Sequence, residues 1–315
     1  MKRMRIAAIG EIMVELSIGG DQDVAAQLGY AGDTANTAIY LKRLAGDALD
    51  VAYISVLGTD QLSDRIVSFL DAESLDTQWI SRHPSRPPGL YAITVDEAGE
   101  RSFIYWRENA AARTLFQKSS DIEENAGTDG SRFACLYDFD VVYFSGITLA
   151  ILPVAVRQDF LDVLSDFRQK GGQVAFDSNY RPKLWSSRED AINAIGRAWS
   201  LCDIALPSVD DEQALFGDRT GVDVLDRLQK YGITEGALKC GEHGPIPLDS
   251  GINLDPLPAA RTVVDTTAAG DSFNGAYLAA RFCGASEAQA ITRGHHCASA
   301  VVGKRGAIVS LDTAT

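Results

Sequence analysis

The sequence predicts an α/β fold: a doubly wound, mostly parallel sheet flanked by helices, with a small β-sheet lid beside it. Two observations predict the main sheet. Short, nearly continuous apolar runs alternate with amphipathic helical patterns, and most of these runs end in a Gly, Asp, Asn or Ser turn. A third observation predicts the lid, because one region alternates polar and apolar residues around a turn, as a two-faced hairpin does.

Six apolar runs are the predicted strands of the main sheet. They span residues 6–10, 51–58, 141–146, 173–179, 203–208 and 236–241. Helical patterns lie between them at residues 34–46, 156–172 and 221–232, and each ends in glycine. In a sheet of this kind, ligands bind beyond the C-terminal ends of the strands.

The predicted lid consists of two segments, about residues 11–34 and 87–109, within a single domain of residues 1–315. The second segment contains the hairpin "GLYAITVDEAGERSFIYWREN", whose turn is "DEAGE" at residues 96–100. The first contributes the early strand "IMVELSI". Because the hairpin does not follow the pattern of buried parallel strands, we expect a separate small sheet.

Composition excludes several classes of function. The 315 residues carry a formal net charge of −14, which repels nucleic acid and anionic lipid surfaces. No apolar run approaches the length of a membrane span. Glu11 and Glu15 interrupt the apolar N-terminal stretch, so it predicts a buried strand rather than a signal peptide. Five cysteines without a CxxC pair suit a reducing cytoplasm.

The stretch "DTTAAGDSF" at residues 265–273 predicts an anion site at the start of a helix. Its small residues Ala268, Ala269 and Gly270 let backbone N–H groups approach a ligand, and a helix N-terminus attracts negative charge. Asp271, which follows them, has two alternative roles. It can cap the helix, as aspartate commonly does, or it can accept a proton from a nucleophile beside a bound phosphate.

This stretch resembles the C-terminal signature of the ribokinase-like (PfkB) sugar kinases, and two further motifs resemble the same family. "GYAGDTANTAIYLKRLAG" is similar to its N-terminal glycine motif, and "VLGTDQLSDRI" is similar to its GxDxxG motif, with Ser63 in place of glycine. The resemblance covers essentially the whole chain in order. Runs such as "RPPGLYAI" and "DSNYRPKLW" most resemble those of bacterial kinases of 2-keto-3-deoxygluconate, a sugar acid.

The resemblance implies a ribokinase-like domain that uses ATP to phosphorylate 2-keto-3-deoxygluconate at its terminal hydroxyl. A fructokinase or another sugar kinase of the family is the alternative, and a non-catalytic sugar sensor is disfavoured by the intact "AAGD". An acidic protein needs arginines to bind a carboxylate, because guanidinium pairs with it through two hydrogen bonds. The residues implied to bind the sugar acid are Gly32, Asp33, Asn36, Tyr91, Tyr105, Arg107, Arg181 and Asp271, with Glu15 as a further candidate.

The family's mechanism implies that Asp271 is the base and that the backbone amides of Ala268 to Asp271 hold the transferring phosphoryl group. No GxxxxGK[ST] run exists, so a P-loop is excluded. The residues implied to contact the nucleotide are Ser208, Lys239, Gly241, Gly244, Thr267 and Gly270. We also expect Pro245 and Pro247 to interrupt the strand after this turn.

Two metal ions belong to the same expectation. Mg²⁺ accompanies ATP, and Asp211 stands where the family organises water bound to Mg²⁺. K⁺ activates parts of the family through groups near Asp265 and Thr267. No residue is implied as a certain direct ligand of either ion.

The implied partners are a small sugar acid, ATP and a second copy of the chain. An open lid hairpin exposes an apolar face, and pairing two such sheets covers it. We therefore expect a homodimer or a higher homo-oligomer.

Overall fold

The first predicted strand, β1 (Met4–Ile9), is buried inside the main sheet between β4 and β8. The computed structural model describes residues 3–18, 26–95, 101–117 and 132–311. In these residues the main sheet has eight strands in the order β12-β11-β10-β9-β8-β1-β4-β5. The other seven are β4 (Leu49–Gly58), β5 (Ile80–His83), β8 (Val141–Ser145), β9 (Gln173–Asp177), β10 (Ile204–Ala205), β11 (Glu235–Lys239) and β12 (Pro245–Pro247).

The predicted doubly wound sheet is confirmed. All six predicted strands are present, and every neighbouring pair from β11 to β5 is parallel. The strand β5 was not predicted, because it is short and carries no long apolar run. The prediction that Pro245 and Pro247 interrupt a strand is wrong. They form the ends of β12, an antiparallel edge strand, where one side of the backbone needs no partner and proline is tolerated.

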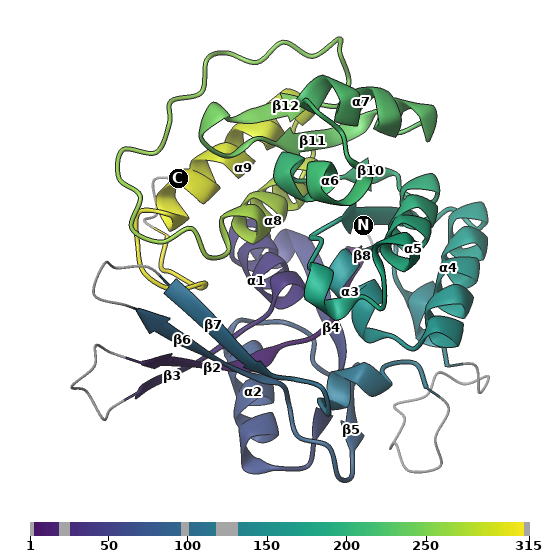
Figure 1. Ribbon diagram of the computed structural model, residues 1–315, viewed down its shortest axis with the longest axis vertical. Helices are drawn as coiled ribbons and strands as arrows, with labels where there is room; N and C mark the ends of the chain where they lie inside the picture. Colours follow the sequence, from purple (N-terminus) through teal and green to yellow (C-terminus); the bar gives the residue numbers. More distant parts are fainter. Residues whose placement is uncertain (1–2, 19–25, 96–100, 118–131, 312–315) are drawn as a thin grey trace.

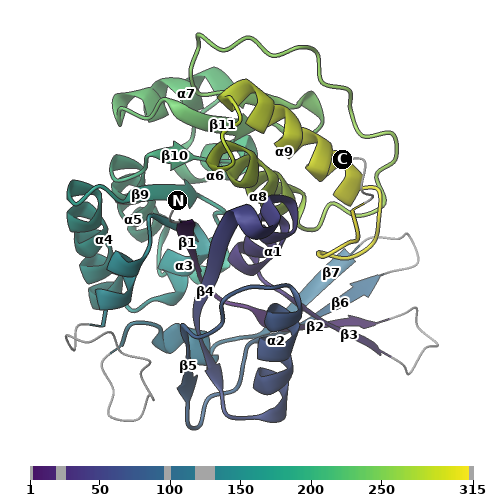
Figure 2. The same cartoon turned by 180° about the vertical axis from the view of Figure 1, so that it is seen from behind.

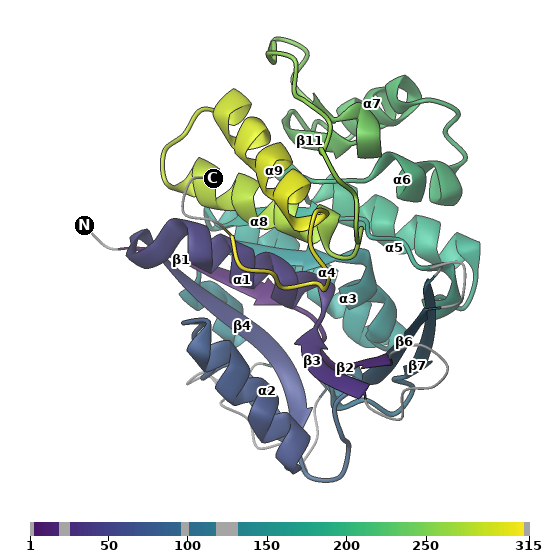
Figure 3. The same ribbon diagram turned by 90° about the vertical axis from the view of Figure 1, so that its left-hand side faces the viewer.

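Helices cover both faces of this sheet (Figure 3). Successive residues of β1 alternate between the two core clusters, as the pleat of a strand requires. Helices α1, α2, α8 and α9 pack on one cluster, and α3 to α7 pack on the other. Their bounds are α1 (Asp33–Ala45), α2 (Gln61–Ala72), α3 (Gly146–Ile151), α4 (Val154–Gln169), α5 (Arg188–Ser200), α6 (Val209–Phe216), α7 (Gly221–Lys230), α8 (Ala269–Phe282) and α9 (Glu287–Val301).

A second sheet projects from one side of the molecule, beyond the end of α1 (Figures 1 and 2). In the described residues it has four strands in the order β3-β2-β6-β7. They are β2 (Met13–Ile18), β3 (Ala26–Ala31), β6 (Leu90–Val95) and β7 (Arg101–Trp106), all within the two predicted lid segments. The predicted turn "DEAGE" lies outside the described residues. The small second sheet is thus present, and its action as a lid stays a prediction.

Close packing of α1 on α8 positions the site. Gly275 lies where the two helices approach, and a β-carbon there would meet the backbone oxygen of Thr37 at 2.6 Å and the backbone nitrogen of Leu41 at 2.9 Å. Only glycine permits this approach. The N-terminal turns of both helices therefore lie together at the C-terminal ends of the strands, where a doubly wound sheet binds ligands.

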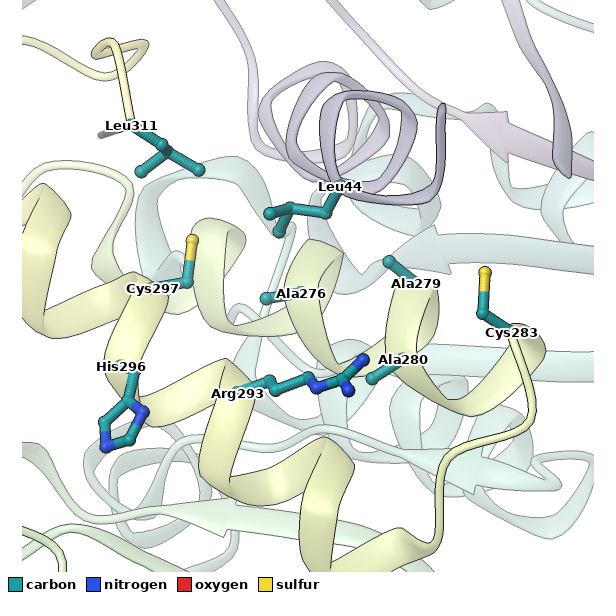
Figure 4. A pocket seen from close by; sticks show the side chains of 9 residues that line it. All are labelled: Leu44, Ala276, Ala279, Ala280, Cys283, Arg293, His296, Cys297 and Leu311. Atoms are coloured by element: carbon teal, nitrogen blue, oxygen red, sulfur yellow. The ribbon is translucent and has the colours of Figure 1, made fainter. Parts of the chain in front are cut away.

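A cavity of about 300 Å³ lies elsewhere, between α1, α8 and α9 (Figure 4). The residues that line it include Ala276 and Ala280 of α8, Cys283 directly after α8, and Arg293 and His296 of α9. Ala276, Ala280 and Cys283 lie about two to four turns beyond the start of α8, so the cavity is separate from the predicted phosphoryl site. No helix among the described residues is long and apolar enough to span a membrane.

Candidate active site

The turn that begins α8 has the backbone of an anion site. Ala268 precedes the helix with a left-handed conformation, φ 59° and ψ 16°, which is strained for a residue other than glycine. The N–H of Ala269 donates to the carbonyl of Thr266 at 3.2 Å, and that of Ser272 donates to the carbonyl of Ala268 at 2.8 Å. Between them, the N–H groups of Gly270 and Asp271 have no partner among the described residues. Two unpaired donors thus remain at the positive end of the helix.

Asp271 is not the cap of this helix. It occupies the third helical position, and no side chain caps the N-terminus. Its Oδ2 instead accepts a hydrogen bond from Asn36 Nδ2 in α1 at 2.8 Å. The capping alternative is therefore excluded, and the carboxylate faces the site beside the unpaired amides.

The environment of Asp271 favours its neutral form. Burial and the negative charges of Asp33 and Asp177 raise its pKa, and the Asn36 hydrogen bond and the charge of Lys239 lower it, with a net rise to about 7. A carboxyl group with a pKa near neutrality can accept a proton and later release it.

The predicted sugar-binding residues of α1 lie together. Gly32 donates its N–H to Asn36 Oδ1 at 3.3 Å, so one amide side chain joins the glycine turn to Asp271. Asp33 Oδ2 accepts from Asn179 Nδ2 at 2.9 Å. A β-carbon at Gly32 would lie 2.0 Å from the Glu11 carbonyl, so this position admits only glycine.

The second sheet presents aromatic side chains and a buried ion pair. Tyr91 is buried and donates its hydroxyl to Glu15, and its ring lies 5.7 Å from that of Tyr105, which is about half exposed. Arg107 is also buried and pairs with Glu11. Burial raises the Glu11 pKa and the charge of Arg107 lowers it, with a net rise. The arginine is thus buried directly after β7 and is not a solvated charge.

Arg181 lies in a different group. Its Nη1 donates to Asp211 Oδ1 at 3.0 Å and to the carbonyl of Tyr180 at 2.8 Å, and about half of its side chain is exposed. Asp211 lies in the first turn of α6, and Ser208 is the residue before this helix. Ser208 forms an isolated β-bridge with Lys239 at the end of β11. Burial raises the pKa of Asp211. The two predicted arginines therefore contact two different carboxylates.

The remaining predicted residues form turns. Gly241 and Gly244 both have positive φ, 55° and 79°, and a β-carbon at either would meet nothing within 4 Å. Asp265 accepts from the N–H of Thr267 at 3.0 Å and from the N–H of Gly306 at 2.7 Å, so it anchors the loop before α8. No cluster of three His, Cys, Asp or Glu side chains that could hold a metal lies in the described part of the chain. The expected K⁺ site stays a prediction.

Sequence reasoning missed three residues at this site. Glu11 is the partner of Arg107, and Asp177 and Asn274 both bond Lys239 Nζ, at 2.7 and 2.9 Å. The signal for Asp177 was present, because "DSN" follows directly on a buried apolar strand. Nothing in the sequence pairs Asn274 with a lysine 35 residues away.

Comparison with known proteins agrees with this geometry. The chain is 42% identical over 317 residues to a 2-dehydro-3-deoxygluconokinase of Dickeya dadantii (strain 3937), with 99% of each chain covered. It is 41% identical to the same enzyme of Escherichia coli (strain K12), with 97% of each covered. A solved 2-dehydro-3-deoxygluconokinase of Thermotoga maritima superposes with a TM-score of 0.79 at 20% identity, covering 98% of this chain and 96% of that one.

The family match spans nearly the whole chain. Residues 4–314 match the family described as "pfkB family carbohydrate kinase". The chain belongs to the pfkB family of carbohydrate kinases.

Proposed function

We propose that this kinase uses ATP to phosphorylate the terminal hydroxyl of 2-keto-3-deoxygluconate, giving 2-keto-3-deoxy-6-phosphogluconate. "2-Dehydro" and "2-keto" name the same oxidised carbon, so the relatives' printed activity matches this substrate. The observation that carries the proposal is Asp271, whose pKa is raised to about 7 and whose carboxylate lies beside two unpaired backbone amides.

The chemistry needs a base and a site for negative charge. Asp271 takes the proton of the sugar's terminal hydroxyl as the oxygen forms a bond to the γ-phosphorus of ATP. The bond from that phosphorus to the β–γ bridging oxygen breaks, and ADP leaves. The N–H groups of Gly270 and Asp271 hold the charge on the phosphoryl group in transit.

The acidic end of the substrate requires a guanidinium. Arg107 is buried next to Tyr105 and Glu11, with its Nε unpartnered among the described groups. A buried donor without a partner costs free energy, so a ligand that accepts from it gains affinity. We assign Arg107 to the carboxylate, with Tyr91 and Tyr105 shaping the sugar site.

The nucleotide occupies the opposite part of the site, along Ser208, Lys239, Gly241 and Gly244. Open space above both glycines leaves room for a flat base or ribose. When bound, Mg²⁺ neutralises charge on the phosphate oxygens. A single carboxylate suits an ion held mainly by phosphates and water, so Asp211 is the residue that would contact its water shell.

A substrate panel tests the proposal. Purified protein with MgATP is offered 2-keto-3-deoxygluconate, its galactonate epimer, fructose and ribose, and ADP release is measured. We expect kcat/KM for the sugar acid to exceed that for fructose by at least about 100-fold, because fructose offers no carboxylate to the unpartnered Nε of Arg107. A preference for fructose overturns the assignment and favours the fructokinase alternative.

We also propose that the chain forms a homodimer through the second sheet and works in the cytoplasm. Leu28, Ile104 and Trp106 lie on the sheet face opposite Tyr91 and are 41, 48 and 57% exposed. A second copy would cover this face. The five cysteines are free, which suits a reducing compartment.

A further inference from the structure

The side chain of Lys239 extends from the end of β11 to the start of α8. Its Nζ donates to Asp177 Oδ2 at 2.7 Å and to Asn274 Oδ1 at 2.9 Å, and only 10% of the side chain is exposed. A β-carbon built on Gly270 would lie 3.3 Å from this Nζ. The ammonium group therefore lies directly against the turn that carries the two unpaired amides.

The partners of Lys239 are themselves fixed. Asp177 Oδ2 also accepts from Asn274 Nδ2 at 2.7 Å, and that nitrogen donates to Tyr143 Oη at 3.1 Å. Asp177 Oδ1 accepts from the N–H of Asn179 at 3.2 Å. The carboxylate and the amide thus hold the ammonium group from two sides in a buried network.

A lysine ammonium has three N–H donors, and the described residues engage two of them. The third N–H has no partner among these residues. The positive charge lies against Gly270, where we propose that negative charge develops during phosphoryl transfer. A purely structural lysine in a buried ion pair would not need a position against a ligand-binding turn.

We propose that Lys239 is a catalytic residue that donates its third N–H to the phosphoryl group in transit, and that Asp177 and Asn274 are positioning residues that aim it. This inference rests on the proposed phosphoryl transfer at the start of α8. Lys239 keeps its proton throughout. As the acceptor oxygen bonds to phosphorus and the bridging oxygen leaves, the ammonium compensates charge on the equatorial oxygens.

The same network acts on Asp271 through its charges. The charged groups that act on Asp271 are Asp33 from α1, Asp177 from β9 and Lys239 from β11, and the titratable phenols coupled to it include Tyr91 of β6 and Tyr143 of β8. The Asn36 amide donates a hydrogen bond to it. The Asp177 charge raises the pKa of Asp271 and the Lys239 charge lowers it. Neutralising each residue should therefore shift the acid limb of the pH profile in opposite directions, which a general loss of stability would not do.

The test compares Lys239→Met and Asp177→Asn with Lys230→Met, an exposed lysine at the end of α7. Loss of one charge-stabilising donor typically lowers kcat by 10²–10³, so we expect Lys239→Met to lose about 100-fold in kcat. The sugar KM should stay within a few-fold, and the acid limb should move to higher pH. Asp177→Asn should move the limb to lower pH. Lys230→Met should match the wild type.

A second variant protects the test against misfolding. Because one buried charge without its partner destabilises a fold, the double variant Asp177→Asn/Lys239→Gln removes both charges together. It should fold, bind a non-hydrolysable ATP analogue, and show a kcat as low as Lys239→Met. A kcat within threefold of wild type in either Lys239 variant, or limbs that move in the same direction, overturns the inference.

The assignment of the substrate can be wrong while the role proposed for Lys239 is right. If the wild type phosphorylates another sugar in the panel, the variants are measured with that sugar, and the role of Lys239 is judged on its kcat.

Discussion

Arg107 and Glu11 form a buried ion pair between the end of β7 and the loop that joins β1 to β2. Each partner also keeps an unpartnered buried atom, Arg107 Nε and Glu11 Oε1. The pair ties the second sheet to the main one while leaving hydrogen-bonding capacity for a ligand. A substrate carboxylate can accept a hydrogen bond from the unpartnered Nε while Arg107 stays paired with Glu11.

The first prediction concerns the shape of this guanidinium. Arg107→Lys keeps a positive charge for Glu11 but loses the planar fork. A hydrogen bond to a charged group contributes about 1.5–3 kcal/mol, so the KM for the sugar acid should rise roughly 10- to 100-fold. The KM for ATP should stay constant. Steady-state kinetics measures both, with the exposed Arg219→Lys as the control.

A different result would remove Arg107 from the carboxylate. If the variant weakens a neutral ketose as strongly as the sugar acid, the arginine serves the sheet and not the acid group.

The second prediction is a pH dependence. Asp271 must be ionised to accept a proton, and its pKa is raised to about 7. Below this pH, kcat/KM should fall about tenfold for each pH unit. Asp33→Asn removes the negative charge that raises the Asp271 pKa most and should move the limb to lower pH. The measurement is kcat/KM for the sugar between pH 5 and 9 at saturating MgATP. A wild-type profile flat down to pH 5 contradicts the raised pKa.

The third prediction concerns stability. The folded pKa of Asp271 lies above its unfolded value of 3.8, so ionisation opposes folding, and this cost grows as pH rises from about 4 to 7. Asp271→Asn removes it. With allowance for partial exposure, we expect a gain of about 2 kcal/mol at pH 8.5, or a few degrees in Tm.

The gain should shrink at pH 5.5, where the wild-type carboxyl is already mostly protonated. Thermal unfolding of both proteins at the two pH values measures this. An equal Tm difference at both values would show that charge is not its cause.

The fourth prediction concerns assembly. Ile104 is 48% exposed on the outer face of β7, and Ile104→Glu would place a charge inside the proposed dimer contact. We expect the wild type to sediment as a dimer at micromolar concentration and the variant as a monomer. Val222→Glu, at an exposed apolar position of α7, should leave the dimer intact. A monomeric wild type contradicts the proposal.

The sequence predicted the main sheet well because its strands are buried on both faces and read as unbroken apolar runs. It missed β5 because a strand of four residues carries too little pattern, and it wrongly expected two prolines to interrupt the strand that is β12. It also identified Asn36 and Asp271 through their motifs. Their contact joins residues 235 positions apart, so only the folded chain brings them together.

Other contacts could not be inferred from pattern. Arg181 bonds Asp211, because the start of α6 lies next to the loop after β9, and its expected contact with a substrate carboxylate stays a prediction. In the sequence, Glu11 only interrupts an apolar stretch, and its ion pair with Arg107 is visible only in the folded chain. Long-range pairing of charges depends on topology, which single-residue chemistry does not encode.

The central claim is that Asp271 is the base of phosphoryl transfer at the start of α8. Its most direct test is the single-turnover rate of Asp271→Asn with 2-keto-3-deoxygluconate and MgATP, with the product identified by phosphorus NMR. The structure predicts a folded protein whose rate falls by about 10³-fold, since a positioned general base contributes 10²–10⁴. A rate within tenfold of wild type, with the phosphate still on the terminal hydroxyl, would contradict the claim.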